Sequence, residues 1–338
     1  MPLLRQAPRL DRADAIRIAR EMYGLHTSAS ALPSERDQNF LLTSAAGGRF
    51  VLKVANAGEN RAMLDAQNAA MAHVADRAWL CPRVLPTIAG DTIGIAPDGT
   101  HLIRLLTYLA GIPLAEAAAH TPVLFEHVGQ AVGRLDAALA DFDHPALHRD
   151  FHWDLVHAAR VIGEHLPLIR DDRGRQLVER VSAASLQAID GRQAAFRRSA
   201  VHHDANDWNV LVDGDQVVGI IDFGDMVHGW TVADPAVAAA YAMLDAPDPL
   251  PAAAAIVRGY QAQHPLGDEE LGAVFPLACL RLCMSACIAA WQRQQRPDDD
   301  YLAVSQGPIR RTLPALAAIA PRTAESVLRA ACGLEPRA

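Results

Sequence analysis

One segment of the chain, residues 201–225, restricts the fold more than any other. Two apolar runs in it flank an Asp-Gly dipeptide, and this pattern predicts a β-hairpin. Because a hairpin brings its two ends together, we expect Asp204 and Asn209 on one side to approach Asp222 on the other. Two carboxylates and an amide oxygen are hard ligands of the kind that suit Mg²⁺. The segment therefore predicts a metal site at the open end of a hairpin.

A single lysine is the second constraint. Lys53 is the only lysine, so 30 of the 31 basic residues are arginine. It lies in the apolar run 50–54, which has the composition of a strand. Arginine is a bulky planar fork and lysine a compact ammonium, so the two are not interchangeable in a tight phosphate site. Lys53 is therefore either an edge-strand residue with its ammonium group in solvent or a phosphate ligand.

The order of the periodic segments indicates an α+β chain, with a small β-rich lobe over residues 1–107 and a larger, mostly helical lobe over 108–338. The first lobe is expected to contain helices at 11–23 and 60–75, irregular structure at 26–33, and strands at 39–43, 49–54, 84–88, 92–95 and 101–106. The second is expected to contain the hairpin and helices at 121–140, 152–163, 173–189, 232–244, 250–263, 268–295 and 308–332.

The composition narrows the class of protein. The chain has 338 residues, with 31 basic and 39 acidic side chains and a formal charge of −8. A nucleic-acid or anionic-membrane surface needs a basic face, so we expect neither partner. The five cysteines suggest no disulfide framework and the N-terminus lacks the pattern of a signal peptide, so we expect a cytoplasmic protein. The apolar stretch 273–291 contains Pro276 and Arg281, which argues against a membrane span.

The spacing inside the hairpin segment carries a resemblance. His202-x-Asp204 with Asn209 five residues later, followed by Asp-Phe-Gly at 222–224, matches the catalytic-loop and metal-binding signatures of kinases. The chain resembles the kinase-like phosphotransferases that include aminoglycoside and choline kinases. The stretches 32–40, 203–209 and 221–225 look closest to the hydroxylysine-kinase-like branch. The resemblance covers nearly the whole chain and implies a bilobal protein-kinase-like fold with a nucleotide bound between the lobes.

The resemblance also implies roles for four residues. Asp204 would be the catalytic aspartate that accepts or orients the proton of the substrate hydroxyl. Asn209 and Asp222 would hold Mg²⁺ against the triphosphate of ATP or GTP, and Lys53 would neutralise the α- and β-phosphates. This agrees with the chemistry of phosphoryl transfer, which depends mostly on positioning and charge neutralisation.

The phosphate-covering loop departs from the kinase pattern. No glycine occurs in residues 26–38, so Ser30, Ser34 and the backbone amides of this stretch are expected to cover the phosphates. No Ala-Pro-Glu follows the Asp-Phe-Gly, which indicates a small acceptor rather than a protein.

The residue expected to pair with Lys53 also departs from the kinase pattern. The helix position that aligns with the usual lysine-pairing glutamate is Gln67, which lies on the apolar stripe of its helix and needs a polar partner. A hydrogen bond between Lys53 and Gln67 would hold the lysine less firmly than an ion pair does. Glu59 or Asp65 could take the place of Gln67, or the activity could be low.

Further side chains are expected to support the site. His202 is expected to fix the backbone of the catalytic loop, with a general-base role as the alternative. Asp234, on the helix after the metal loop, is expected to accept hydrogen bonds from the catalytic loop or to cap its own helix. Asp207 and Asp225 border the site and could bind a cationic substrate, a second metal or water.

The apolar segment 268–295 carries one unusual cation. Arg281 is expected either to pair with a buried carboxylate or to bind a substrate carboxylate through its two-pronged guanidinium, which would suit an amino-acid acceptor. Cys279, Cys283 and Cys287 recur on one face of the same helix, where three ligands cannot surround a zinc ion, so we expect them in the core.

The leading interpretation is a kinase that phosphorylates a hydroxyl group of a small acceptor, expected to be cationic, such as an amino alcohol or a hydroxylysine-like amino acid. Aminoglycoside, choline, ethanolamine or homoserine acceptors are the alternatives within the class. A metal-dependent phosphohydrolase built on His202, His203, Asp204 and Asp222 is a different class, but it leaves Lys53 without a role. An inactive, nucleotide-binding partner module is the third interpretation.

Overall fold

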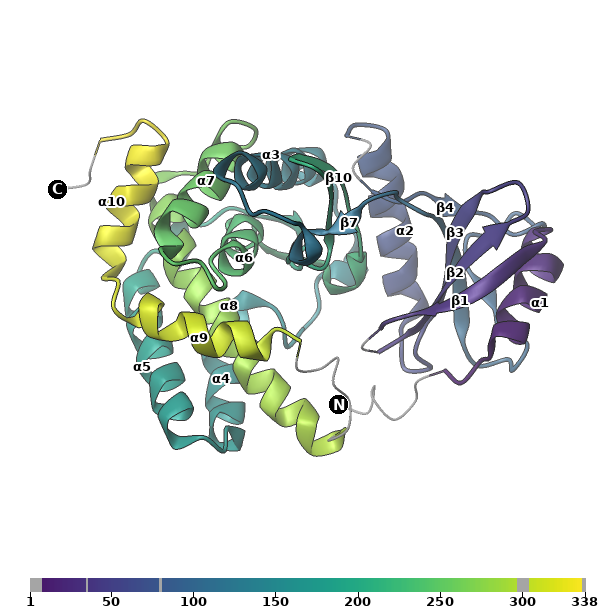
Figure 1. Ribbon diagram of the computed structural model, residues 1–338, viewed down its shortest axis with the longest axis horizontal. Coiled ribbons are helices and arrows are strands. Elements are labelled where there is room, and N and C mark those ends of the chain that lie inside the picture. The colour runs from purple at the N-terminus through teal and green to yellow at the C-terminus, as the bar shows by residue number, and fades with distance from the viewer. Residues whose placement is uncertain (1–7, 35, 79–80, 297–303, 336–338) are drawn as a thin grey trace. The chain divides into compact units, whose positions relative to one another are not determined.

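The computed structural model describes residues 8–34, 36–78, 81–296 and 304–335. The chain divides into two compact units, Met1–Ala110 and Gly111–Ala338. The sequence predicts the boundary three residues earlier, between residues 107 and 108. Figure 1 shows mainly strands, with α1 and α2, in the first unit and mostly helices in the second.

The first unit is an antiparallel sheet with two helices. Its helices are α1 (Arg12–Tyr23) and α2 (Arg61–Ala75). Its strands are β1 (Thr27–Leu32), β2 (Gln38–Ser44), β3 (Arg49–Val54), β4 (Val84–Leu85), β5 (Gly94–Ile95) and β6 (Leu102–Thr107). They follow the order β1-β2-β3-β6-β4, and β5 also pairs with β6.

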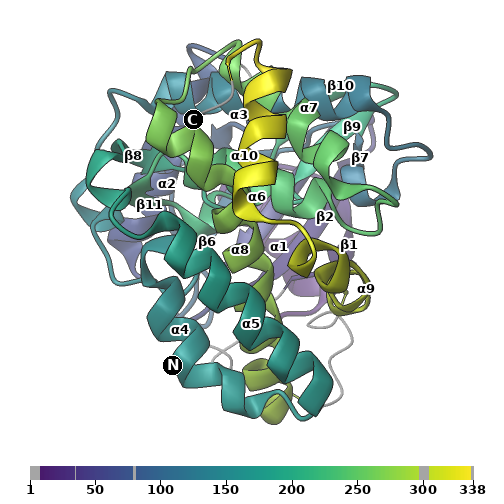
Figure 2. The ribbon, with the colours of Figure 1, turned by 90° about the vertical axis from the view of Figure 1, so that its left-hand side faces the viewer.

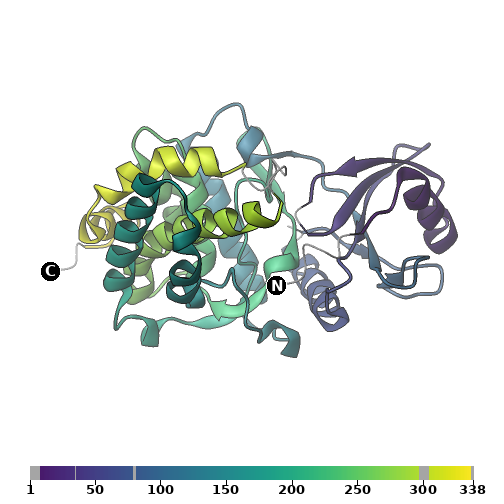
Figure 3. The same ribbon diagram turned by 90° about the horizontal axis from the view of Figure 1, so that it is seen from below.

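One face of this sheet packs against α1 (Figure 3). Alternate residues of β2, β3 and β6 are apolar and buried, and they contact Ile18 and Ala19 of the helix. A capping box between Asp11 and Asp14 begins α1, and Gly24 ends it with a φ of 67° in the left-handed region. Because the core occupies one face, the polar residues at the alternating positions lie on the other.

The irregular structure predicted for residues 26–33 is a wrong prediction, because β1 occupies Thr27–Leu32. This strand pairs with β2 without a break, from Thr27 opposite Ser44 to Leu32 opposite Asn39. Its alternating Ser and Ala side chains are small and give little periodic signal, and the unpaired backbone groups of β2 supply the pairing. Ser30 is thus a strand residue, and Ser34 lies in the connection that follows.

The second unit is mostly helical. Its helices are α3 (Pro122–Leu139), α4 (Ala158–His165), α5 (Asp172–Ile189), α6 (Ala233–Ala242), α7 (Pro249–Gln261), α8 (Asp268–Gln295), α9 (Gln306–Ala317) and α10 (Pro321–Ala331). Its strands are β7 (Ile112–Pro113), β8 (Arg198–Val201), β9 (Val210–Asp213), β10 (Gln216–Ile220) and β11 (Val227–Trp230). They form two small sheets, β10-β9-β7 and β11-β8.

Helix α8 lies at the centre of this unit, and α4, α5, α6 and α10 pack against it (Figure 2). Its length and hydropathy would allow it to cross a membrane, yet 89% of its most apolar window is buried inside the protein. Cys279, Cys283 and Cys287 are buried free thiols in this core. The central position of α8 therefore accounts for its apolar composition.

Two local differences from the predicted elements have clear causes. The hairpin β9–β10 pairs Asp213 with Gln216, so its turn is Gly214-Asp215, and Gly214 has a φ of 57° that suits a glycine. The helix predicted over 308–332 is two helices, because Pro321 begins α10 and the residue before it is extended.

Candidate active site

In the first unit, Lys53 lies in the middle of the sheet. The register of β3 places Lys53 opposite Asn39 of β2 and opposite Arg104 of β6. Residues opposite each other on antiparallel strands project from the same face. Lys53, Asn39 and Arg104 therefore form a polar row across three strands, on the face that the α1 core leaves open.

Helix α2 contributes two amides to this row. Arg104 is 3% exposed, and its Nη2 donates to Oε1 of Gln67 at 2.8 Å while its Nη1 donates to Oδ1 of Asn68 at 2.9 Å. The sequence led us to expect a hydrogen bond between Gln67 and Lys53. In the structure Gln67 accepts from Arg104 instead. The reason is burial, because a buried guanidinium requires acceptors and the two amide oxygens supply them.

In the second unit, the carboxyl group of Asp204 is held by three donors. Asn206 Nδ2 donates to Oδ1 at 2.9 Å, and Asn209 Nδ2 donates to Oδ2 at 2.7 Å. Arg281 Nη2, from α8, also donates to Oδ1 at 2.5 Å. Asp204 and Asn209, which were both expected to approach Asp222, are joined to each other by a direct hydrogen bond.

The loop that carries Asp222 adjoins the catalytic loop. The amide of Ile221 donates to the carbonyl of Asn209 at 2.9 Å, which joins the two loops at the open end of the hairpin. Asp222 has a φ of 64°, a left-handed conformation that is uncommon outside glycine. Its Oδ1 accepts from the amide of Gly224 at 3.2 Å, so a local Asx turn stabilises that conformation.

The oxygen donors around Asp204 are of a kind that suits a bound cation. Burial raises the pKa of Asp204 well above its usual range, Arg281 opposes that rise, and the carboxyl groups of Asp225 and Asp222 add to it. The carboxyl groups of Asp204, Asp222 and Asp225 bring hard oxygen donors close together. This donor set fits a divalent ion such as Mg²⁺, for which Asn209 and Asp222 are the predicted ligands.

Asp234 holds the backbone of the catalytic loop. This residue of α6 is fully buried, and its two carboxyl oxygens accept from the amides of His202 at 2.8 Å and His203 at 2.6 Å. His203 has a φ of 66°, so the loop adopts a strained conformation at this point. The two hydrogen bonds stabilise it directly before Asp204.

His202 links the two functional loops. Its Nε2 contacts the carbonyl of Ile221 at 3.1 Å, and its Nδ1 accepts from the amide of Asp204 at 3.2 Å. These contacts assign the Nε2–H tautomer, and burial lowers the pKa of the imidazole, so it is neutral. His203 is equally buried, with Nε2 against Trp153 and Leu155. Among the described residues, neither ring belongs to a group that could hold a metal ion with Asp204, which argues against the phosphohydrolase.

The two bordering aspartates differ in their surroundings. Burial raises the pKa of Asp207 to about 6, and its Oδ1 is a buried atom that receives no hydrogen bond from the described residues. Its carbonyl accepts from the amide of Ala115 at 2.8 Å, which fixes its backbone. Asp225 is also buried, and its charge acts on Asp204. Asp207 therefore offers an acceptor atom to a donor that the described part of the chain does not supply.

Arg281 pairs with a buried carboxylate, which is one of its two expected roles. Besides its bond to Asp204, its guanidinium lies over the ring of Trp153, 4.4 Å from the centroid. Its Nη1 donates to the carbonyl of His203 at 3.4 Å. The charge of Arg281 is thus directed at Asp204.

Several side chains of the site could not be identified from the spacing of residues in the sequence. Asn206, Trp153 and Arg104 were not among the predicted site residues. Arg149 was not either, although its Nη2 donates to the carbonyls of Gly224 and Met226, both at 2.9 Å. Their roles depend on distant elements. Only Arg104 could have been noticed in the sequence, as a cation inside an apolar strand.

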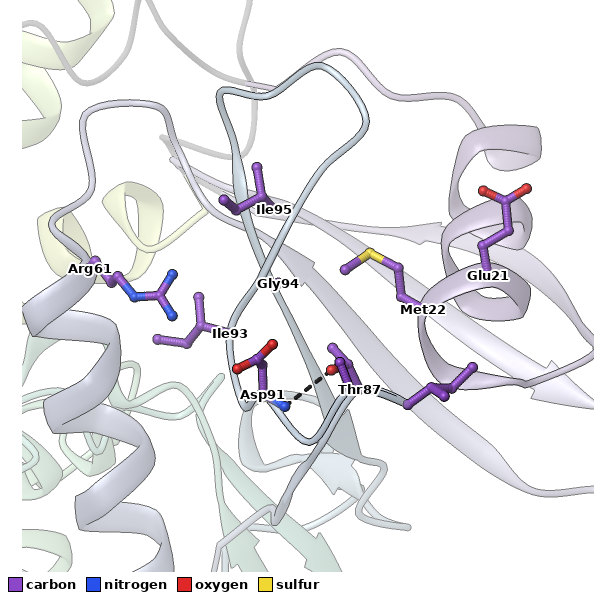
Figure 4. A pocket seen from close by; sticks show the side chains of 10 residues that line it. Glu21, Met22, Arg61, Thr87, Asp91, Ile93, Gly94 and Ile95 are labelled. Carbon is purple, nitrogen blue, oxygen red and sulfur yellow. Dashed lines mark hydrogen bonds between the residues drawn. The ribbon is translucent and has the colours of Figure 1, made fainter.

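A separate pocket opens in the first unit, beside the end of α1 and β5 (Figure 4). Arg61, Asp91 and Ile93 are among its lining residues, and the amide of Asp91 donates to Thr87 Oγ1 at 3.1 Å. None of the predicted site residues lines it. It is therefore distinct from the polar row of Lys53.

Comparison with known proteins agrees with this geometry. A sequence model of the phosphotransferase enzyme family matches residues 28–271. The hydroxylysine kinases of Danio rerio and Mus musculus are 30% and 31% identical to this chain over 317 and 328 residues. The matches cover 88% of this chain and 89% and 87% of those proteins.

A solved structure shares the fold. The amicoumacin kinase hAmiN, in complex with AMP-PNP, Ca²⁺ and Ami, matches with a TM-score of 0.69 and 15% identity, over 91% of this chain and 93% of that one. The expected α+β, kinase-like fold with a β-rich first part and a helical second part is confirmed.

Proposed function

Because this chain belongs to the phosphotransferase enzyme family, we propose that it transfers the γ-phosphoryl group of ATP or GTP, with Mg²⁺, to a hydroxyl group of a small amine. That it is a small-molecule phosphotransferase follows from the family. The carboxyl group of Asp204 carries the finer proposal, because Asn209 and Arg281 hold it in one orientation beside two further carboxylates. A fixed carboxylate of this kind can receive a hydroxyl proton.

In the proposed reaction, each bond formed or broken and the released proton can be assigned. The acceptor oxygen forms a bond to the γ-phosphorus, the bond from that phosphorus to the bridging oxygen of the nucleoside diphosphate breaks, and the hydroxyl proton passes to Asp204. Asn209 and Asp222 would hold Mg²⁺, which supplies charge neutralisation for the triphosphate. Lys53 would add a compact positive charge to the phosphates. Ser30 and Ser34 remain predicted phosphate contacts.

For the acceptor, we propose a hydroxylysine-like amino acid or an amino alcohol. The hydroxylysine kinases that match 88% of this chain support that choice. Asp207 adds a physical argument, since its buried Oδ1 receives no donor from the described residues and an ammonium group would supply one. Arg281, which is paired with Asp204, is a weaker candidate for the carboxylate of the acceptor.

The test is Mg²⁺-dependent release of ADP or GDP with a panel of acceptors: 5-hydroxylysine, homoserine, choline, ethanolamine and several aminoglycosides. Wild type should respond to an amine of this set, and Asp204→Asn should not. Asp190→Asn is the matched control, because Asp190 is an exposed carboxylate at the end of α5. Tight nucleotide binding without turnover for any acceptor would favour the inactive module, and no nucleotide binding would exclude the proposed kinase.

A further inference from the structure

Two histidines and one aspartate gather at the surface of the second unit, in a cluster that includes none of the candidate active-site residues. The cluster consists of Asp143, His148 and His228, and one ligand atom from each lies within 4.8 Å of those of the other two. Asp143 and His148 are exposed, and His228 is half-buried. Imidazole nitrogens and carboxylate oxygens are ligands of zinc and related transition-metal ions. The cluster therefore offers a donor set that differs from the oxygen donors around Asp204.

A short turn brings two members of the cluster together. The 3-10 helix Pro145–Leu147 separates Asp143 from His148, and its proline fixes the backbone at the first position. Its leucine is fully buried, which anchors the turn in the core. Nε2 of His148 lies 2.9 Å from Oδ1 of Asp143. The neighbouring His144 uses its Nδ1 to accept from the amide of Ala146, so its ring serves the turn itself.

The third member, His228, comes from β11 and reaches the ring of His148. The preceding residue, Val227, is buried in a cluster with Phe151 and Val201. Successive side chains of a strand point to opposite faces, so His228 projects away from that cluster. Its ring stacks on the ring of His148, with the centroids 4.3 Å apart and the planes at 19°. Two imidazolium ions would repel each other at this distance, so the stack favours a neutral ring, which is the form that binds metals.

Asp143 is the anionic member of the cluster. The hydrogen bond with His148 lowers the pKa of its carboxyl group, and the charges of His148 and His228 lower it further. A zinc ion that is about 2.0–2.2 Å from each ligand atom holds these atoms roughly 3.4 Å apart in a tetrahedral site. The side chains of Asp143 and His148 are 60% and 49% exposed, so small rotations can bring the ligand atoms to that separation.

The cluster lies beside the Asp-Phe-Gly loop, to which Arg149 connects it. Arg149 follows His148 in the chain, and its Nη2 donates to the carbonyls of Gly224 and Met226, both at 2.9 Å. His228 is two residues after Met226 in the same segment. An ion held by both histidines would therefore join the two segments at a second point, next to the one that Arg149 makes.

We propose that Asp143, His148 and His228 form a binding site for a divalent transition-metal ion such as Zn²⁺, and that the bound ion clamps the segment 143–149 to β11. The side chains supply two nitrogens and one oxygen, and water supplies a fourth ligand because the cluster is open to solvent. The ion replaces the proton between Nε2 of His148 and the carboxylate, so this ring carries its proton on Nδ1. Mg²⁺ prefers oxygen ligands, so it competes weakly here. The inference does not rest on the proposed kinase function.

Titration of the full chain with Zn²⁺, followed by calorimetry in excess Mg²⁺, tests the site. The excess Mg²⁺ occupies oxygen-donor sites such as the one proposed at Asp222. Wild type should bind one Zn²⁺, and His148→Gln and His228→Gln should each weaken binding at least about tenfold, since even the loss of an outer-shell partner costs roughly 10- to 100-fold. His157→Gln is the matched control, because His157 also contacts an aspartate, Asp150 at 3.5 Å, but belongs to no such cluster among the described residues.

Amide hydrogen exchange tests the clamp and requires no activity. With Zn²⁺, the amides of residues 224–230 should exchange more slowly in wild type, because the ion opposes local opening of β11. In His148→Gln, Zn²⁺ should leave their exchange unchanged. Asp222→Asn should keep both the wild-type affinity for Zn²⁺ and the slowed exchange, since Asp222 is not part of the cluster.

Four results would contradict the inference. Wild type that binds no Zn²⁺, or wild-type affinity in both histidine variants, would overturn the site. Weakening in Asp222→Asn equal to that in His148→Gln would assign the ion to the oxygen donors near Asp222 and would also overturn it. Binding that leaves the exchange of residues 224–230 unchanged would overturn the clamp. If His228→Gln does not fold, His148→Gln and Asp143→Asn decide, because both of these side chains are exposed.

Discussion

The two units hold their functional charges in different ways. In the second unit, Asp204 is tied to Arg281 by an ion pair, and buried Asp234 holds the loop before it. In the first unit, Lys53 lies in a row with Arg104, which is held by the neutral amides of α2. Charged partners fix a geometry strongly, and losing one leaves a buried charge uncompensated. The two amide oxygens of α2 accept from Arg104 without cancelling its charge.

This difference predicts a steep dependence on single charges in the second unit. Asp204→Asn keeps the size of the side chain but cannot accept the substrate proton, so kcat should fall by about 10³-fold, within the range for a general base. Mg²⁺–nucleotide affinity, measured by calorimetry, should stay within a fewfold of wild type. Turnover of Asp204→Asn at the wild-type rate would show that the catalytic residue is assigned wrongly.

The corresponding substitution in the first unit removes the only lysine. Lys53→Met should lower kcat/KM for the nucleotide by about 10²-fold, because it deletes one preorganised charge on the phosphates. Lys53→Arg should not restore the rate, since a guanidinium fork does not replace a compact ammonium in a tight site. Steady-state kinetics at saturating acceptor measure both variants. A Lys53→Met enzyme with normal kcat/KM would remove Lys53 from the phosphate site.

The second unit was also the easier one to predict from sequence. The hairpin signal and the spacing from His202 to Asn209 are local, so the approach of Asp204 and Asn209 to the loop of Asp222 could be expected from the residues alone. In the structure the amide of Ile221 joins that loop to the carbonyl of Asn209. The bonds of Asp234 to the catalytic loop were one of two roles considered for it. The pairing of Arg281 with Asp204 was likewise one of two alternatives, because sequence spacing does not reveal which partner folding brings to α8.

The first unit was harder because its signals are weak or non-local. Strand β1 consists of small residues whose alternation carries little apolar contrast, and only its pairing with β2 shows it to be a strand. The assignment of Gln67 to Lys53 followed the usual spacing, but Arg104 lies 37 residues away and accounts for the amide.

A smaller effect is expected when a predicted metal ligand of the second unit is changed. Asp222→Asn removes one charged ligand, so the Mg²⁺ concentration for half-maximal rate should rise about tenfold, which corresponds to about 1.4 kcal/mol. Asp190→Asn should leave it unchanged, as an exposed carboxylate remote from the Asp-Phe-Gly loop in sequence. A Mg²⁺ titration of the initial rate measures both. An unchanged requirement in Asp222→Asn would exclude Asp222 as a metal ligand.

The smallest effect on activity is expected at Gln67, and it tests the contact between Arg104 and the amides of α2 most directly. Gln67→Leu removes an acceptor from buried Arg104, so the free energy of unfolding should fall by about 1–3 kcal/mol. If Gln67 serves Arg104, kcat/KM for the nucleotide should change by less than about threefold, a difference of roughly 0.7 kcal/mol. Gln187→Leu, at an exposed position of α5, is the matched control and should alter neither quantity. A large loss of kcat/KM without loss of stability in Gln67→Leu would instead place Gln67 at Lys53 or at the nucleotide.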